Sequence, residues 1–190
     1  IMKVLNKKIV VFLSLVLLFA VGLVGCSSES NQEAKTEFLS IATGGTSGTY
    51  YPIGGAMAKI ISDEVANTSA SAQSTGASVT NTRLVSKKEV QLAIVQNDIA
   101  SYAFNGANKF KDKPVKNMRG IATLYPEIIQ IVVREGTGIE NIKDLAGKKV
   151  AVGAPGSGVE ANAKQILANF DLTYDDIEED YLSFSEAASR

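Results

Sequence analysis

The order of apolar patterns along the chain constrains its fold more than any other feature of the sequence. Short apolar runs typical of strands alternate with stretches whose apolar residues recur at helical spacing, and small or polar turns separate them. The first pair is the run at residues 38–42 and the stretch at residues 51–65, where Ile53, Met57 and Ile60 share one helical face. Repeated strand–loop–helix units predict an α/β fold with mainly parallel sheets.

The same alternation continues to the end of the chain. Further strands are expected at residues 70–74, 90–95, 118–124, 128–133, 149–153 and 181–183. Further helices are expected at residues 76–87, 97–104 and 159–170, with a helical turn at 142–145 and the opening of another helix at 185–188. Ligands of such folds bind beyond the carboxyl ends of the strands, so the residues after each strand are the candidates for a site.

The N-terminal segment has the layout of a secretory signal: a basic start with three lysines, then an apolar run at residues 9–24. The motif Leu-Val-Gly-Cys that ends at Cys26 resembles a bacterial lipobox, whose cysteine is lipidated and becomes the mature N-terminus. We therefore expect a lipoprotein signal peptide at residues 1–26 and a polar, flexible tether at residues 27–37. An uncleaved anchor helix is the alternative, and both interpretations place the remaining chain outside the cytoplasm.

Charge and residue usage exclude several classes of function. Three of the 19 basic residues lie in the signal segment, which leaves 16 basic and 20 acidic residues and a net charge of −4. A balance of this sign disfavours nucleic acid as a partner. The chain has no histidine, the commonest general base and metal ligand. The acidic run at residues 175–180 lacks the spacing of a calcium loop and is interpreted as a solvated charged surface. No cofactor or metal is expected.

Two glycine-rich turns, at residues 43–48 and 153–158, lead from an expected strand into an expected helix. Free N–H groups at a helix start attract an anion, and glycine lets a ligand approach the backbone. Each turn alone has an ordinary alternative: a tight connection without any ligand, with Thr75 and Ser157 acting only as helix caps and the tyrosines only as packing residues. Two such turns in one chain favour a binding site that closes on its ligand from two sides.

The segments TGGTSGTYYPIGGAMAKII, STGASVTN, VQLAIVQND, TLYPE and VAVGAPGSGVEANA resemble the TAXI family, the solute receptors of tripartite ATP-independent periplasmic (TRAP) transporters. The resemblance runs from about residue 38 to the last residue. It implies a type II periplasmic-binding-protein fold with lobe 1 at residues 38–135, the start of lobe 2 at residues 136–190 and a crossover near residues 134–141. Members of this family are longer, so the second lobe is expected to be incomplete.

The resemblance also implies a function: a receptor that is held to the cell membrane by its lipid and passes a small anionic solute to TRAP permease subunits. The solute expected is an organic acid or acidic amino acid, such as glutamate or a dicarboxylate. The candidate binding residues are Gly45, Thr46, Tyr50, Tyr51, Thr75, Gly76, Gln96, Asn97, Gly156, Ser157 and Gly158. Two alternatives stay open: an exported enzyme on the same scaffold that acts on a carboxylated or phosphorylated substrate, and a lipoprotein that serves only as an adhesin.

Overall fold

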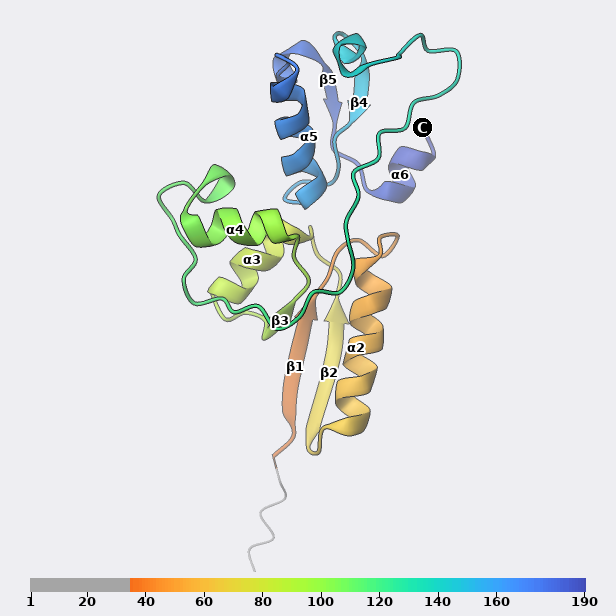
Figure 1. Ribbon diagram of the computed structural model, residues 1–190. Coiled ribbons are helices and arrows are strands. Elements are labelled where there is room, and N and C mark those ends of the chain that lie inside the picture. Colours follow the sequence, from red (N-terminus) through yellow and green to blue (C-terminus); the bar gives the residue numbers. More distant parts are fainter. Residues whose placement is uncertain (1–34) are drawn as a thin grey trace, which may run out of the picture. The chain divides into compact units, whose positions relative to one another are not determined.

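The computed structural model describes residues 35–190, so the predicted signal peptide, Cys26 and most of the predicted tether lie outside the described residues. Helices and strands alternate along this part of the chain (Figure 1). The first elements are β1 (Glu37–Ala42), α2 (Tyr50–Glu64), β2 (Thr68–Gln73), α3 (Ser78–Ser86), β3 (Leu92–Ala93), α4 (Asn97–Asn105) and the 3-10 turn η1 (Asn108–Phe110). The later ones are η2 (Ile142–Leu145), β4 (Lys149–Ala151), α5 (Gly158–Asn169), η3 (Tyr174–Asp176), β5 (Glu178–Asp180) and α6 (Phe184–Ala188).

The strands form two parallel sheets, which confirms the predicted α/β class. The first sheet has the order β2-β1-β3, with Glu37 opposite Thr68 and Ala42 opposite Ala93. The second pairs β4 with β5 in parallel. Because all three strands of the first sheet run in one direction, their carboxyl ends and the turns that follow lie at one edge of the sheet.

Helix α2 packs on the first sheet through a stripe of small side chains. Tyr50, Gly54 and Ala58 are its buried residues, four positions apart and therefore on one helical face. A Cβ at Gly54 would overlap the side chain of Thr43, the residue that follows β1. The absence of that Cβ lets the helix lie against β1 and β2, as Figure 1 shows, and fixes Tyr50 beside the carboxyl end of the sheet.

Two hydrophobic clusters form the core, and α5 contributes to both. The first cluster contains Val79, Ile99, Ala103, Phe110, Val115 and, from α5, Ala161. The second contains Leu145, Val152, Ile177 and, from α5, Leu167. The two halves of α5 therefore pack in different clusters. No helix within residues 35–190 combines the length and the apolar character needed to span a bilayer.

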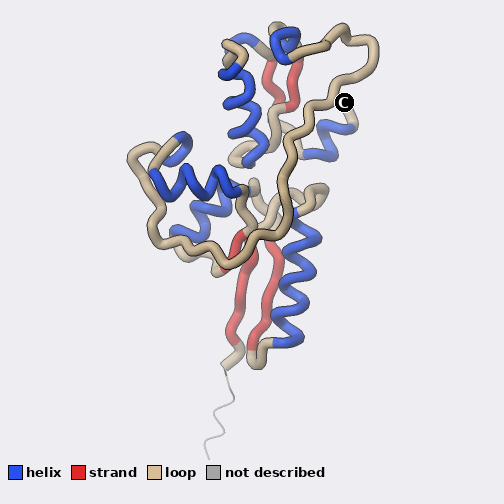
Figure 2. Tube along the Cα trace, viewed as in Figure 1, coloured by secondary structure: helices blue, strands red, loops and turns tan. Residues whose placement is uncertain are grey.

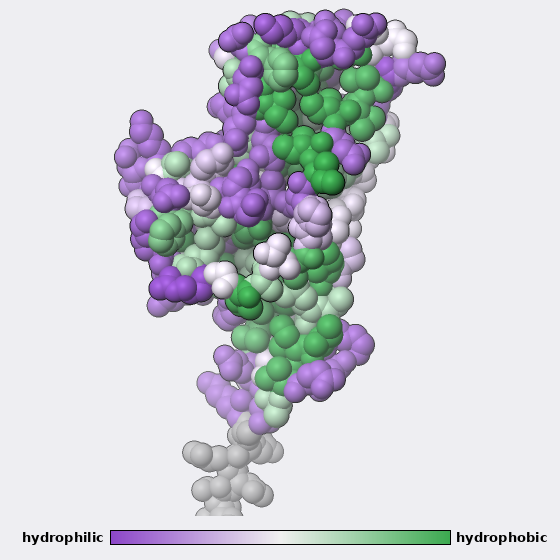
Figure 3. All heavy atoms as spheres, in the orientation of Figure 1, coloured by the Kyte–Doolittle hydropathy of each residue, from purple (hydrophilic) through white to green (hydrophobic). Residues whose placement is uncertain are grey.

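The predicted strands at residues 118–124 and 128–133 are wrong: the structure has no strand there, and Figure 2 draws this stretch as loop. Both runs have β-type sequences, but no described strand pairs with them. Most of their apolar side chains reach the surface instead, with Ile121 82% and Val132 87% exposed. Figure 3 shows apolar residues at the surface in this region. A β-type pattern forms a strand only where a neighbour accepts its hydrogen bonds.

The last predicted strand also differs. It was expected at residues 181–183 but lies at β5, inside the acidic run that was interpreted as a solvated surface. Lys149 of β4 explains why acidic residues can form a strand there. Its ammonium lies 3.6 Å from Glu178 and 3.4 Å from Asp180, on the neighbouring strand. Opposite charges on adjacent strands offset the low strand preference of acidic residues. The remaining predicted strands and helices are present with small shifts in their ends, although β3 has two residues rather than six.

Candidate functional site

The turns after β1, β2 and β3 are joined at the carboxyl edge of the first sheet by one buried amide, Asn81 of α3. Its Nδ2 donates to the carbonyl of Thr43 at 2.5 Å and to the carbonyl of Ile94 at 2.8 Å. Its Oδ1 lies 2.6 Å from the hydroxyl of Thr75, which donates to it. Asn81 has no exposed surface. A single side chain thus fixes the three turns that carry most of the predicted site residues.

Two predicted residues, Tyr50 and Gln96, meet at the start of α3. The hydroxyl of Tyr50 lies 3.4 Å from that of Ser78, the first residue of the helix. Ser78 also accepts the backbone N–H of Gln96 at 3.1 Å. Tyr50 and Ser78 are both buried. Residues from the beginnings of α2, α3 and α4 therefore surround one set of hydroxyl groups.

A second tyrosine joins this cluster from the segment between η1 and η2. The rings of Tyr50 and Tyr125 meet edge to face, with centroids 6.4 Å apart. The hydroxyl of Tyr125 donates to Glu127 at 3.2 Å. Burial, with a smaller effect of the Glu127 charge, raises the pKa of Tyr125 to about 12, and burial raises the pKa of Tyr50 further above its ordinary value. Both phenols are therefore neutral hydrogen-bond donors at physiological pH.

The other predicted residues that precede the second glycine-rich turn are of two kinds: Thr75 stabilises a turn, and the others lie at or near the surface. Thr75 Oγ1 accepts the N–H of Ala77 at 3.0 Å and contacts Asn81, so it acts here as a turn residue. Gly45, Thr46 and Asn97 are exposed. Tyr51 and Gly76 are half-buried.

The second glycine-rich turn lies directly on the start of α3. The carbonyl of Gly156 accepts the N–H groups of Val79 at 3.1 Å and Thr80 at 3.2 Å. Ser157 caps α5 by accepting the N–H of Glu160 at 3.0 Å. The structure thus brings the two predicted halves of the site into contact, and their polar groups bind each other.

Three of the predicted glycines, Gly76, Gly156 and Gly158, have no room for a side chain. A Cβ at Gly76 would lie 2.9 Å from the carbonyl of Pro155, and one at Gly156 would lie 2.6 Å from Thr80 Oγ1. A Cβ at Gly158 would overlap the side-chain amide of Gln96. In this structure the glycines therefore allow one loop to approach the other. Their predicted role beside a solute stays a prediction.

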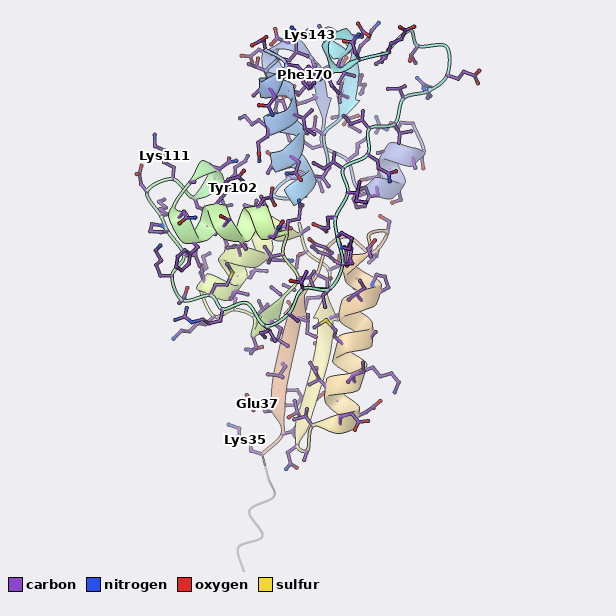
Figure 4. The ribbon with its side chains drawn as sticks, in the orientation of Figure 1. Lys35, Glu37, Tyr102, Lys111, Lys143 and Phe170 are labelled. Carbon is purple, nitrogen blue, oxygen red and sulfur yellow. The ribbon has the colours of Figure 1, made fainter. Side chains whose placement is uncertain are left out.

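A polar interface continues from these turns along α4 and α5. Gln96 donates to Asn162 at 2.7 Å, and Asn162 donates to Asp98 at 2.8 Å. Tyr102, labelled in Figure 4, donates to Gln165 at 3.0 Å. These side chains are only partly exposed, so water competes weakly with their hydrogen bonds.

An ion pair closes the same interface. Lys109 Nζ lies 2.7 Å from Glu160, whose side chain is 8% exposed. The other carboxylate oxygen of Glu160 accepts the N–H of Gly156 at 3.0 Å. Burial works to raise the pKa of Glu160. The hydrogen bonds from Lys109 and Gly156, with the charges of Lys109 and Lys164, outweigh that effect and hold the pKa below its usual value.

The lowered pKa of Glu160 predicts a loss of stability in acid. A carboxyl group whose pKa is lower when folded stabilises the fold above its unfolded pKa of about 4.3, and this contribution is lost as the pH falls through the folded value. In denaturant titrations at pH 6 and pH 3, the Glu160→Gln variant should therefore lose less stability between the two pH values than the wild type.

The exposed Glu179→Gln variant is the control and should follow the wild type. An equal loss in Glu160→Gln and wild type would contradict the assignment. The wild type will lose stability in acid in any case, because capping hydrogen bonds also lower the pKa of three other carboxyl groups: Asp144, Asp176 and Glu186.

Four residues of this region were not among the predicted site residues: Ser78, Asn81, Tyr125 and Lys109. For Asn81 the only indication in the sequence was a polar residue on the apolar face of the helix predicted at residues 76–87. Lys109 carries no local signal, because its partner lies 51 positions away. Residues 35–190 contain no group of three His, Cys, Asp or Glu side chains that could hold a metal ion.

One comparison with known proteins bears on these loops. The model of the NMT1-like family matches residues 41–190, a stretch that includes both glycine-rich turns and both sheets from the end of β1 onward. The NMT1-like family is a family of periplasmic solute-binding proteins.

Proposed function

We propose, on the premise that this chain belongs to the NMT1-like family of solute-binding proteins, that it is an extracytoplasmic receptor for a small organic acid or acidic amino acid. Its family and its parallel α/β sheets agree with a periplasmic-binding-protein-like fold. The proposal goes further in naming an acidic solute, held between lobe 1 at residues 38–135 and lobe 2 from residue 136. The solute is bound and released without chemical change.

The observation that supports this proposal best is the convergence of uncharged donors at the start of α3. The hydroxyl groups of Tyr50 and Ser78 lie together there, with the N–H groups of the first helical turn beside them. Donors of this kind suit a carboxylate, because helix-terminal N–H groups and hydroxyls can all donate to its oxygens. Tyr50 and Tyr125 provide apolar ring surface for the body of the solute. The predicted residues Gly45, Thr46 and Asn97 form the exposed rim, and the predicted Tyr51 is half-buried.

The cellular setting is part of the same proposal. The lipobox-like motif supports lipid attachment at Cys26, which would tether the receptor at the outer face of the membrane that holds its permease. The motifs shared with the TAXI family support a TRAP-type permease as the partner that receives the solute. A receptor of this kind needs no cofactor, because hydrogen bonds and closure of the site supply the affinity.

Calorimetric titration of the full chain with L-glutamate, L-aspartate, succinate and 2-oxoglutarate tests the proposal. At least one of these acids should bind, and Tyr50→Phe should weaken that binding by about tenfold, the usual effect of one lost hydrogen bond to a charged group. Tyr181→Phe, which changes an exposed tyrosine of the second half, is the matched control and should leave the affinity unchanged.

Two results would count against the receptor. Binding of none of the four acids would exclude the proposed solute class, and unchanged affinity in Tyr50→Phe would exclude this site. NMR of the solute after prolonged incubation separates a receptor from an enzyme, since a receptor returns the solute unaltered.

A further inference from the structure

Helix α3 begins without the side-chain cap that a helix start normally has. Ala77 occupies the N-cap position, and its side chain has no acceptor atom that could bind the free N–H groups of the first turn. Its backbone has φ +67° and ψ −147°, a conformation rare outside glycine. The N–H groups of Val79 and Thr80 donate instead to the carbonyl of Gly156, which lies 76 or more residues further along the chain.

The loop that supplies this carbonyl is fixed at its far end by charge. The N–H of Gly156, which lies in the peptide group before the one that carries this carbonyl, donates to Glu160 at 3.0 Å, so that carboxylate holds Gly156 in place. Glu160 is held in turn by Lys109 at 2.7 Å, a residue of η1 that follows α4. A chain of contacts thus runs from Lys109 through Glu160 and Gly156 to the first turn of α3.

We propose that residues 153–157 form a latch loop that competes with the solute for the N–H groups of Val79 and Thr80, with Lys109 and Glu160 as its positioning residues. A solute carboxylate that binds the start of α3 must displace the Gly156 carbonyl. The loop can move about Ser157, whose hydroxyl keeps the start of α5 capped, while Ala161, in the first turns of that helix, stays packed in the first hydrophobic cluster. Gly153 and Gly156, at φ +95° and +77°, are the points where the backbone of the loop can turn.

The latch makes solute affinity depend on residues that do not touch the solute. A receptor whose competent state is only partly populated binds with an affinity reduced by that fraction. Loosening the loop should therefore strengthen binding, whereas loss of an ordinary structural contact would weaken it or leave it unchanged. This ligand-linked part rests on the proposed function; the contact between the latch loop and α3 does not.

Amide hydrogen exchange in the full chain, followed by NMR without solute, tests the latch. In Lys109→Met the N–H groups of Val79 and Thr80 should exchange about tenfold faster than in the wild type, because their acceptor departs more often. The N–H of Ile94, bonded to the carbonyl of Ala42 in the first sheet, should keep its wild-type rate and report that the fold is intact. Lys111→Met changes an exposed lysine two positions away (Figure 4) and is the matched control.

Gly156→Ala is a second, independent variant. The added Cβ would meet Thr80 Oγ1, and the alanine backbone would have to keep the positive φ of Gly156. Both effects should displace the loop and leave the ion pair of Lys109 with Glu160 in place. The same two N–H groups should again exchange about tenfold faster. Wild-type exchange at Val79 and Thr80 in both variants, with Ile94 unchanged, would overturn the proposal.

L-Glutamate titration of the same proteins adds the ligand-linked readout. Lys109→Met should bind it more tightly than the wild type by up to the factor seen in exchange, and Lys111→Met should match the wild type. Equal or weaker binding by Lys109→Met, where the wild type binds, would overturn competition between loop and solute. If no variant binds L-glutamate, that result excludes L-glutamate as the solute, and the exchange rates still decide whether the latch exists.

Discussion

Replacement of Asn81 with alanine is expected to lower the free energy of unfolding by about 3 kcal/mol, close to the upper end for a single substitution. The amide donates to the carbonyls of Thr43 and Ile94 and accepts from Thr75, and it is completely buried. Alanine would remove the partner of these groups, and the carbonyls of the buried residues Thr43 and Ile94 could not replace it with water. The cost of buried polar groups that lose a partner exceeds the gain from one hydrogen bond, because the desolvation penalty remains.

Chemical denaturation of the full chain measures this effect. Asn169→Ala, at an exposed position near the end of α5, removes a similar side chain and should change the free energy of unfolding by no more than about 0.5 kcal/mol. Asn81→Asp should cost at least as much as the alanine variant, since a carboxylate cannot donate to the carbonyls. A loss below about 1 kcal/mol in Asn81→Ala would show that the three turns do not depend on this residue.

Two adjacent glycines of α2 should respond to alanine in opposite directions. At Gly55 an added Cβ meets nothing within 4 Å, so alanine should raise the free energy of unfolding by about 0.5–1 kcal/mol through its better helix propensity. At Gly54 the Cβ overlaps Thr43. Thr43 cannot turn away freely, because it is buried and its hydroxyl donates to the carbonyl of Gln73 at 2.6 Å. Gly54→Ala should therefore cost about 2 kcal/mol despite the gain in propensity.

The difference between the two variants, about 3 kcal/mol in total, isolates the helix–sheet contact from helix propensity. Thermal and urea denaturation of both proteins measure it, and far-UV circular dichroism checks that α2 is retained. Similar effects of the two alanines would mean that α2 does not lie as close to β1 as the structure has it.

The sequence was sufficient to predict the α/β class, most helices and the edge of the sheet where the turns gather. The helices and strands follow from the local periodicity of apolar residues, which is present in each stretch of the sequence. The edge of the sheet follows from the general geometry of parallel strands. The strands expected at residues 118–124 and 128–133 failed for a non-local reason: strand formation depends on a neighbour, and a run of apolar residues does not specify one. For β5 the converse holds, because Lys149, about 30 positions away, makes an acidic strand acceptable.

The candidate site was predictable to the level of loops but not of contacts. Tyr50 and Gln96 were identified from their positions after strands, and they do meet at the start of α3. The contact of Gly156 with Val79 was not foreseen, since a glycine in a turn accommodates a solute and another loop equally well. The sequence shows that glycine has no side chain, but it does not show which group occupies the space beside it. The ion pair of Lys109 with Glu160 likewise depends on how α4 and α5 pack.

Helix α5 determines how the chain comes apart as well as how it packs. Ala161 belongs to the cluster beside the first sheet, and Leu167, less than two turns later, belongs to the cluster beside the second. Neither cluster can lose its packing without uncovering one half of the same helix. Because that exposure adds to the free energy of opening either part, partial unfolding is unfavourable. The parts of the chain that contain the two clusters should therefore unfold together in one cooperative transition rather than as independent domains.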